Sequence, residues 1–364
     1  MNSRLREVVL LFLRMGFTAF GGPAAHIALM EREVVQQRGW LDRQAFLDLL
    51  GLTQLIPGPN STEMAIHLGK LRAGWPGLVL GGLAFILPAA CLVGGLAWAY
   101  VRFGTLPAAA GWLYGLKPAL LAIVAQAILI FGRTVLKDSL HWTVALLVLA
   151  GAALGLHEVA LLLLAGLVVL ALRTPWRPKS AYGFSLLPVA AATGSASLFW
   201  SFLKIGSVLY GSGYVLLAFL RAEFVLRHPL LSERQLLDAV AVGQFTPGPV
   251  LTTATFVGYL LQGWRGAALA TLGIFLPSFI FVAFSGKLLE HLQRSERARA
   301  FLDGVNAASL ALMAYVMGAL GKAAVGDRPS MLLAVGSGLL LWRTKLNPTW
   351  ILLGCGALGW LIKS

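Results

Sequence analysis

Four Gly- and Pro-rich interruptions stand inside otherwise apolar stretches, and their residue types are suited to binding a ligand. They are Phe20-Gly21-Gly22-Pro23, Gln54-Leu55-Ile56-Pro57-Gly58-Pro59-Asn60-Ser61-Thr62-Glu63, Gly211-Ser212-Gly213 and Gln244-Phe245-Thr246-Pro247-Gly248-Pro249-Val250-Leu251-Thr252-Thr253. Glycine can end one helix and proline can begin the next, so each interruption predicts a broken helix. The exposed N–H groups and the dipole of the new helix would attract an anion. The alternative is that Gly and Pro only kink a membrane helix.

Polar side chains accompany two of these interruptions. Asn60 and Glu63 have capping-box spacing, which predicts Asn60 as the N-cap of a new helix. Thr246, Thr252 and Thr253 offer hydroxyl groups that could donate to the same anion.

Ionisable residues are costly inside a membrane, so each one is a candidate functional group. Lys117 stands midway along an apolar segment, where it could attract an anion or, alternatively, extend to the membrane surface. Glu63 and His67 are four residues apart on one helical face. They could relay a proton, or they could form a buried hydrogen bond.

Two acidic positions occur in both halves of the sequence, Glu33 with Glu223 and Asp48 with Asp238. Glu33 and Glu223 are candidates for proton coupling. Because Glu33 and Asp48 lie near segment ends, a solvated or helix-capping role is an equal alternative.

The amino-acid composition indicates what kind of protein contains these residues. Of 364 residues, 58% are hydrophobic and 12% charged, against about 25% charged in soluble domains. This excludes an ordinary cytosolic protein and predicts an all-α polytopic membrane protein. The net charge of +14 is spread over short loops with no nucleic-acid motif, so we expect no nucleic-acid partner and a lipid bilayer as the environment.

Apolar segments follow the same plan in both halves. They lie near 7–30, 44–69, 75–101, 108–132, 140–156 and 158–172, and again near 195–220, 235–261, 266–286, 300–321, 331–342 and 348–362. A shift of 190 places Gly16 on Gly206, Glu33 on Glu223 and the first Pro-Gly-Pro on the second. After position 59 one residue is dropped, so the shift becomes 189. The sequence therefore predicts two homologous repeats, residues 1–172 and 194–364, joined by a linker at 173–193.

Loop charges suggest how the repeats are oriented. Lys and Arg favour the cytoplasmic side, and most of them reach it in both halves only if the second half begins on the opposite side from the first. We therefore expect inverted repeats. Inversion needs an odd number of crossings before the second half, which residues 184–200 could supply as an extra span or as a re-entrant segment.

Enzyme motifs are weak in this sequence. Gly354-Cys355-Gly356-Ala357-Leu358-Gly359 matches G-x-G-x-x-G, but it lies inside an apolar helix without the strand that the motif requires. We find no zinc motif, P-loop or Ser/His/Asp pattern, so we expect no enzyme activity, cofactor or metal.

Seven motifs, spread over nearly the whole chain, belong together: Gly16-Phe17-Thr18-Ala19-Phe20-Gly21-Gly22-Pro23, Leu55-Ile56-Pro57-Gly58-Pro59, Phe85-Ile86-Leu87-Pro88, Gly115-Leu116-Lys117-Pro118-Ala119, Gly206-Ser207-Val208-Leu209-Tyr210-Gly211-Ser212-Gly213-Tyr214, Val242-Gly243-Gln244-Phe245-Thr246-Pro247-Gly248-Pro249 and Phe275-Leu276-Pro277-Ser278-Phe279. In these motifs the sequence resembles the chromate ion transporter (CHR) family in its long two-domain form. The sequence departs from the family pattern at Ile56, where Leu is common, and at Gly211-Ser212-Gly213, where the first half has Gly-Gly-Pro. The resemblance implies antiparallel halves and efflux of chromate, which confers chromate resistance.

These observations give one hypothesis, that a tetrahedral oxyanion binds between the repeats near the bilayer midplane and crosses by alternating access. The expected binding residues are Gly21, Gly22, Pro23, Gln54, Pro57, Gly58, Pro59, Asn60, Thr62, Lys117, Gly211, Ser212, Gly213, Gln244, Thr246, Pro247, Gly248, Pro249, Thr252 and Thr253, and the proton-coupling candidates are Glu33, Glu63, His67 and Glu223. Transport of sulfate or another oxyanion and an integral-membrane lipid enzyme are the alternatives. The oligomeric state is left open between a monomer and a homodimer.

Overall fold

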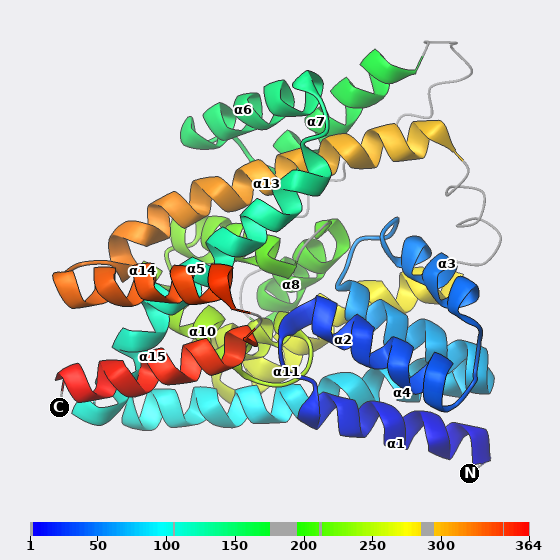
Figure 1. Ribbon diagram of the computed structural model, residues 1–364, viewed down its shortest axis with the longest axis horizontal. Helices are drawn as coiled ribbons and strands as arrows, with labels where there is room; N and C mark the ends of the chain where they lie inside the picture. The colour runs from blue at the N-terminus through cyan, green and yellow to red at the C-terminus, as the bar shows by residue number, and fades with distance from the viewer. Residues whose placement is uncertain are drawn as a thin grey trace.

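The computed structural model describes residues 3–104, 106–174, 195–210, 213–284, 295–344 and 346–363, and within these ranges it is helical without strands (Figure 1). The first half contains α1 (Ser3–Thr18), α2 (Gly22–Glu31), η1 (Arg32–Gln37), α3 (Arg43–Thr53), α4 (Asn60–Phe103), α5 (Pro107–Val135), α6 (Ser139–Ala153) and α7 (Glu158–Arg173). The second half contains α8 (Ser195–Val208), η2 (Gly213–Val215), α9 (Leu216–Arg221), η3 (Ala222–Arg227), α10 (Glu233–Phe245), η4 (Val250–Thr252), α11 (Thr253–Phe284), α13 (Glu296–Ala324), α14 (Arg328–Arg343) and α15 (Pro348–Lys363). The predicted linker and extra span fall largely outside the described residues.

Helices of the two halves correspond at the shift found in the sequence. The six-residue elements η1 and η3 are both π-helical and begin at Arg32 and Ala222. The close contacts of α1 with α4 and of α8 with α11 also correspond. Gly16 packs on the backbone of Phe85 and Gly206 on that of Ile274, positions that the duplication relates.

Helices α4 and α11 each fold back on themselves. The chain turns at Ala73–Gly74 and at Gln262–Gly263, where the two glycines have φ of +67° and +60°. A Cβ on Gly69 would lie 2.2 Å from the carbonyl oxygen of Gly77, across the first turn. In α11 the hydroxyl groups of Thr255 and Thr271 are 2.7 Å apart. Each element is therefore a pair of antiparallel arms, as the separate apolar segments in the sequence predict.

The repeats interlock through their last two helices. The pair α14 and α15 packs along α5 of the first half, and the pair α6 and α7 packs along α13 of the second half (Figure 1). The close approach of α5 and α15 needs small residues, because a Cβ on Gly115 would lie 1.8 Å from the carbonyl oxygen of Cys355. Each half therefore depends on two helices of the other half to cover its own long helix, α5 or α13.

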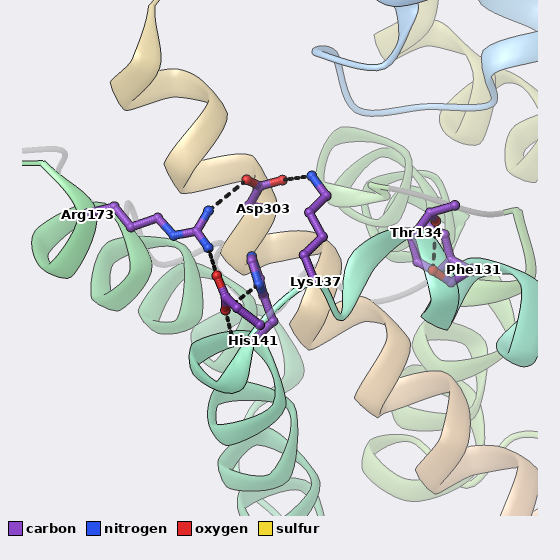
Figure 2. Close-up of polar contacts among 7 residues, drawn as sticks. Phe131, Thr134, Lys137, His141, Arg173 and Asp303 are labelled. Carbon is purple, nitrogen blue, oxygen red and sulfur yellow. Dashed lines mark hydrogen bonds and ion pairs between the residues drawn. The ribbon is translucent and has the colours of Figure 1, made fainter.

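An ion-pair cluster joins α6 and α7 to α13. Arg173 contacts both Asp138, the N-cap of α6, and Asp303 of α13, while Lys137 Nζ lies 3.5 Å from Asp303 Oδ1 (Figure 2). His141, which is buried, lies 2.8 Å from Asp138 through Nδ1. These contacts hold the start of α6 and the end of α7 against α13.

The second half has a corresponding cluster at α14 and α15. Asp327, the N-cap of α14, accepts a hydrogen bond of 2.5 Å from the hydroxyl of Tyr114 in α5. Lys363, near the end of α15, lies 3.8 Å from the same carboxylate. Each interlocked pair is thus fixed by an N-cap aspartate and a base near the end of its second helix.

Four helices within the described ranges are long and apolar enough to cross a membrane. They span Asn60–Phe103, Ala109–Val135, Val250–Phe284 and Glu296–Ala324. Many large apolar side chains on these and neighbouring helices, including Leu129, Trp142 and Phe284, point out of the fold. Such a surface is stable in lipid and not in water, and the prediction of a polytopic helical membrane protein is confirmed.

Candidate functional site

The two Pro-Gly-Pro loops cross between the repeats. The Gly58 N–H donates a hydrogen bond of 2.8 Å to the carbonyl of Leu209, directly after α8. The Gly248 N–H donates one of 3.0 Å to the carbonyl of Ala19, directly after α1. Leu209 and Ala19 are equivalent positions, so each loop binds the end of the first helix of the other repeat.

Further contacts bring the predicted interruptions into one region. A Cβ on Gly213 would lie 3.7 Å from the side chain of Leu251, and one on Gly22 would lie 4.0 Å from the hydroxyl of Tyr214. Asn347 at the start of α15 donates a hydrogen bond of 3.3 Å to the carbonyl of Phe20. Gly211 and Ser212, also predicted to bind, lie outside the described residues.

Both loops require glycine. Gly58 has φ of +141° and Gly248 has φ of +86°, values that other residues rarely adopt. A Cβ on Gly58 would stand 2.2 Å from Glu63 Oε1, and one on Gly248 would stand 2.6 Å from the Cβ of Ala89. The glycine N–H groups are engaged by Leu209 and Ala19, so an anion would have to use other donors.

The start of α4 offers such donors. Helix N-termini leave their first N–H groups without partners in the helix, and here these belong to Asn60 and Ser61. The N–H groups of Thr62 and Glu63 turn back to the carbonyl of Pro59, at 2.8 and 3.0 Å. Pro59 is therefore the N-cap, without a side-chain hydrogen bond, and the predicted capping box of Asn60 and Glu63 is wrong because Asn60 is already the first helical residue.

Side chains around α4 add unpaired polar atoms. Within the described part of the chain, Thr62 Oγ1, His67 Nε2 and Gln244 Nε2 are buried and have no hydrogen-bond partner. Gln54, equivalent to Gln244 in the duplication, is exposed. Thr62 and Gln244 can each donate to an anion, and both are among the predicted residues.

The predicted threonine donors of the second half are engaged instead. Thr246 Oγ1 donates to the carbonyl of Val242 at 3.0 Å, and the hydroxyl groups of Thr252 and Thr253 donate to carbonyls one turn back, each at 2.8 Å. A hydroxyl has one proton to donate, so these three would have to rotate before they could donate to an anion.

Glu63 is a fully buried carboxyl group in the first turn of α4. Ser278 Oγ of α11 donates to its Oε1 at 3.4 Å, and its Oε2 has no partner among the described residues. No hydrogen bond joins Glu63 to His67 in this part of the chain, so the relay between them stays a prediction. Sequence reasoning missed Ser278 as a partner of Glu63, because Ser278 lies 215 residues away, in the other repeat.

Glu33 and Glu223 form equivalent ion pairs. Glu33 contacts Arg14 and lies 2.5 Å from Arg38, and Glu223 lies 2.6 Å from Lys204. Arg14 and Lys204 are themselves related by the shift of 190. Both carboxylates are buried against bases that link the π-helical turns to α1 and α8, and their role in proton coupling stays a prediction.

Lys117 is paired as well. Its Nζ lies 3.0 Å from Asp238 Oδ1 of α10, and the hydroxyl of Tyr100 donates to Asp238 Oδ2 at 3.0 Å. All three polar ends lie inside the protein between α4, α5 and α10. The charge of Lys117, predicted to act on an anion, is therefore balanced in this structure, and sequence reasoning missed its partner because Asp238 comes from the other repeat.

No metal site supplements these residues, since the described residues hold no group of three His, Cys, Asp or Glu side chains that could bind a metal ion. The site offers hydrogen-bond donors, helix N-termini and buried acids. This is chemistry for binding an anion and a proton.

Comparisons with known proteins connect this arrangement with transport. The chain is 36% identical to a chromate transport protein of Cupriavidus metallidurans over 98% of this chain and 92% of that protein. It is 34% identical to one of Pseudomonas aeruginosa, over 96% and 91%, and 31% identical to a probable chromate transport protein of Synechococcus elongatus, over 93% and 90%. No solved structure matches the chain.

The sequence profile of the family described as chromate transporter matches the chain in two parts, residues 6–171 and 196–360. These parts cover both halves of the internal duplication. The two-part match confirms the repeats, and the length of the match confirms the resemblance seen in the motifs. The chain therefore belongs to the chromate transporter family and is a multi-pass membrane protein.

Proposed function

We propose that this chain exports chromate or a closely similar tetrahedral oxyanion by alternating access between two inverted repeats, and that it has no enzyme activity. The observation that supports this most directly is the crossed pair of Pro-Gly-Pro loops, which gathers helix ends of both repeats in one place. Helix breaks at matching positions of two repeats are typical of transporter binding sites. The relatives named for chromate transport share nearly the whole chain.

The anion would bind at the start of α4. The N–H groups of Asn60 and Ser61, the hydroxyl of Thr62 and the amide of Gln244 would supply donors, and the helix dipole would add a favourable field. An ionised Glu63 beside these groups would repel a dianion. Glu63 must therefore be neutral whenever the anion can bind, and its complete burial favours the neutral form throughout the transport cycle.

Inversion gives each repeat the same role on opposite sides of the membrane. The interlocked helices α5 and α13, each covered by two helices of the other repeat, would keep the halves together while one rocks against the other. The repeat boundaries at 172 and 194, with the linker between them, belong to this proposal.

Export is the direction that the membrane potential favours. Moving two negative charges outward across 100 mV, inside negative, releases about 4.6 kcal/mol, from about 2.3 kcal/mol per charge. Uptake would need at least two co-transported cations to cancel this free energy. Export of a toxic oxyanion would confer the resistance that the resemblance implies.

Accumulation of labelled chromate in inside-out membrane vesicles tests the proposal. We expect accumulation that depends on the chain and on an interior-positive potential. Excess unlabelled sulfate distinguishes the substrate, because sulfate has the same charge and shape: full competition would make the chain a general oxyanion transporter. Absence of chromate and sulfate accumulation would contradict the proposed function.

A further inference from the structure

The buried triad of Lys117, Asp238 and Tyr100 connects the two repeats. Lys117 on α5 and Tyr100 on α4 belong to the first half, and Asp238 on α10 belongs to the second. The exposed fraction of Lys117 is 7% and that of Asp238 is 1%. Asp238 precedes Gln244 by six residues, or about 9 Å along the helix axis, so the triad stands beside the crossed loops.

This triad has no counterpart at the duplicated positions. Asp48, which corresponds to Asp238, is exposed and accepts a hydrogen bond from Gln44. The shift of 189 places Lys117 on Asn306, which is uncharged. The ion pairs of Glu33 and Glu223, by contrast, occur at matching positions of both halves. A deeply buried ion pair that only one half contains is suited to a task that the transporter performs once per cycle.

From this geometry, and resting on the proposed function, we propose that Asp238 is a proton site that controls the oxyanion affinity of Lys117. With Asp238 ionised, the pair is neutral and Lys117 offers no net charge to a dianion. When Asp238 takes up a proton, the positive charge of Lys117 is left without a counterion inside the protein, and an entering oxyanion supplies it. Tyr100 keeps the carboxyl group oriented in both states.

Linkage makes the effect reciprocal, so bound oxyanion raises the proton affinity of Asp238 by the same factor. A single proton is exchanged, and the affinity for the anion can therefore rise at most about tenfold for each unit by which the pH falls.

Among the residues that the structure describes, few charged or titratable groups surround Asp238. Lys117 faces it from α5, Tyr100 from α4, and Arg234 acts on it from one turn earlier in α10. On the flank of α10 that faces α9 and α13, Arg221 pairs with Glu233 and stacks over Tyr315.

Binding of sulfate to purified protein in detergent, measured by calorimetry between pH 5.5 and pH 8, tests the proposal. Sulfate is the probe because its own charge is constant over this range. We expect affinity to rise several-fold as the pH falls, with proton uptake shown by the dependence of the binding heat on the buffer. Asp238→Asn should bind with nearly constant affinity across this range, and Lys117→Met should bind at least tenfold more weakly.

Two controls keep the test decisive. The double variant Lys117→Met with Asp238→Asn is neutral in the triad, so it should fold even if a single variant does not, and it should lack the pH dependence. Asp303→Asn alters the ion pairs with Lys137 and Arg173, outside the triad and the anion site, and should keep the pH dependence. An unchanged pH dependence in Asp238→Asn or in the double variant would overturn the assignment of Asp238 as the proton site.

The experiments distinguish a failure of the proposed transport function from a failure of the role proposed for Asp238. If the wild-type chain accumulates neither chromate nor sulfate in vesicles and binds neither anion, the transport function falls and takes this inference with it. If the wild-type chain transports chromate while the double variant keeps the same pH dependence as the wild type, only the role of Asp238 is refuted.

Discussion

Replacing Gly58 by alanine perturbs the crossed loops at one atom. The new Cβ would lie 2.2 Å from Glu63 Oε1 and 2.5 Å from Ser278 Oγ, at a residue with φ of +141°. Neither neighbour can move freely, because Glu63 is fully buried and Ser278 is held in α11. The loop must shift, and the hydrogen bond from Gly58 to Leu209 is then lost.

Two contributions set the magnitude. The unfavourable φ costs about 1–2 kcal/mol, and overpacking a closely packed site costs about 1–3 kcal/mol. We therefore expect Gly58→Ala to lower the free energy of unfolding by about 2–5 kcal/mol. The anion donors at the start of α4 follow the loop directly, so transport of chromate should fall even in the fraction of protein that stays folded.

Two other glycines separate the contributions. Gly74 has φ of +67° but would place its Cβ in open space, so Gly74→Ala should carry only the cost of the unfavourable φ. Gly95 lies within α4 with no neighbour in reach of a new Cβ and no positive φ, so Gly95→Ala should be neutral or stabilising by up to about 1 kcal/mol.

Thermal unfolding in detergent, followed by fluorescence-detected size exclusion, ranks the three variants, and vesicle uptake measures their transport. The expected order of stability is Gly95→Ala, then Gly74→Ala, then Gly58→Ala. A Gly58→Ala protein as stable as Gly74→Ala and fully active in transport would refute the contact between the loop and the other repeat.

Three further outcomes follow from the interlocked helices and the ion pairs. Gly115→Ala should destabilise the protein by about 1–3 kcal/mol through its clash with α15, whereas Gly318→Ala, with open space around it, should not; equal melting temperatures would contradict the close packing of α5 on α15. The hydrogen bond from Tyr114 is the main reason that the pKa of Asp327 falls from its ordinary 3.8 to about 2. Ionised Asp327 therefore stabilises the folded protein fully above pH 3.8, and this stabilisation is lost as the pH falls towards 2. The melting temperatures of the wild type and of Asp327→Asn should accordingly converge at low pH. A difference in melting temperature that stays constant with pH would refute this linkage. Glu223→Gln, which removes the charged partner of Lys204, should lower the melting temperature without changing sulfate affinity, and a large loss of affinity would instead place this pair in the binding site.

Much of the fold can be predicted from the sequence, because local patterns determine it. The apolar segments from 108 to 172 and from 300 to 362 correspond closely to α5 to α7 and α13 to α15, since runs of apolar residues bounded by Gly, Pro and Asp leave few alternatives. The turns at Gly74 and Gly263 lie in the gaps between predicted apolar segments, 44–69 and 75–101 in the first half and 235–261 and 266–286 in the second.

The pairing across the repeats cannot be predicted in this way. The duplication identifies Gly58 and Gly248 as equivalent, but nothing local indicates that each binds the first helix of the other repeat. Lys117 looked available for an anion because its partner Asp238 is far away in the chain. Asn60 looked like an N-cap because capping-box spacing recurs by chance, and here Pro59 takes that position.

Purified protein in sealed proteoliposomes tests the central proposal, electrogenic transport of chromate by this chain, most directly. With labelled chromate outside and a valinomycin-set potassium diffusion potential, an interior-positive potential should drive accumulation and an interior-negative potential should suppress it. Protein-free liposomes and the Gly58→Ala protein serve as controls. Accumulation that depends on the wild-type chain and on the sign of the potential is the predicted result, and uptake equal to that of protein-free liposomes at either potential would contradict it.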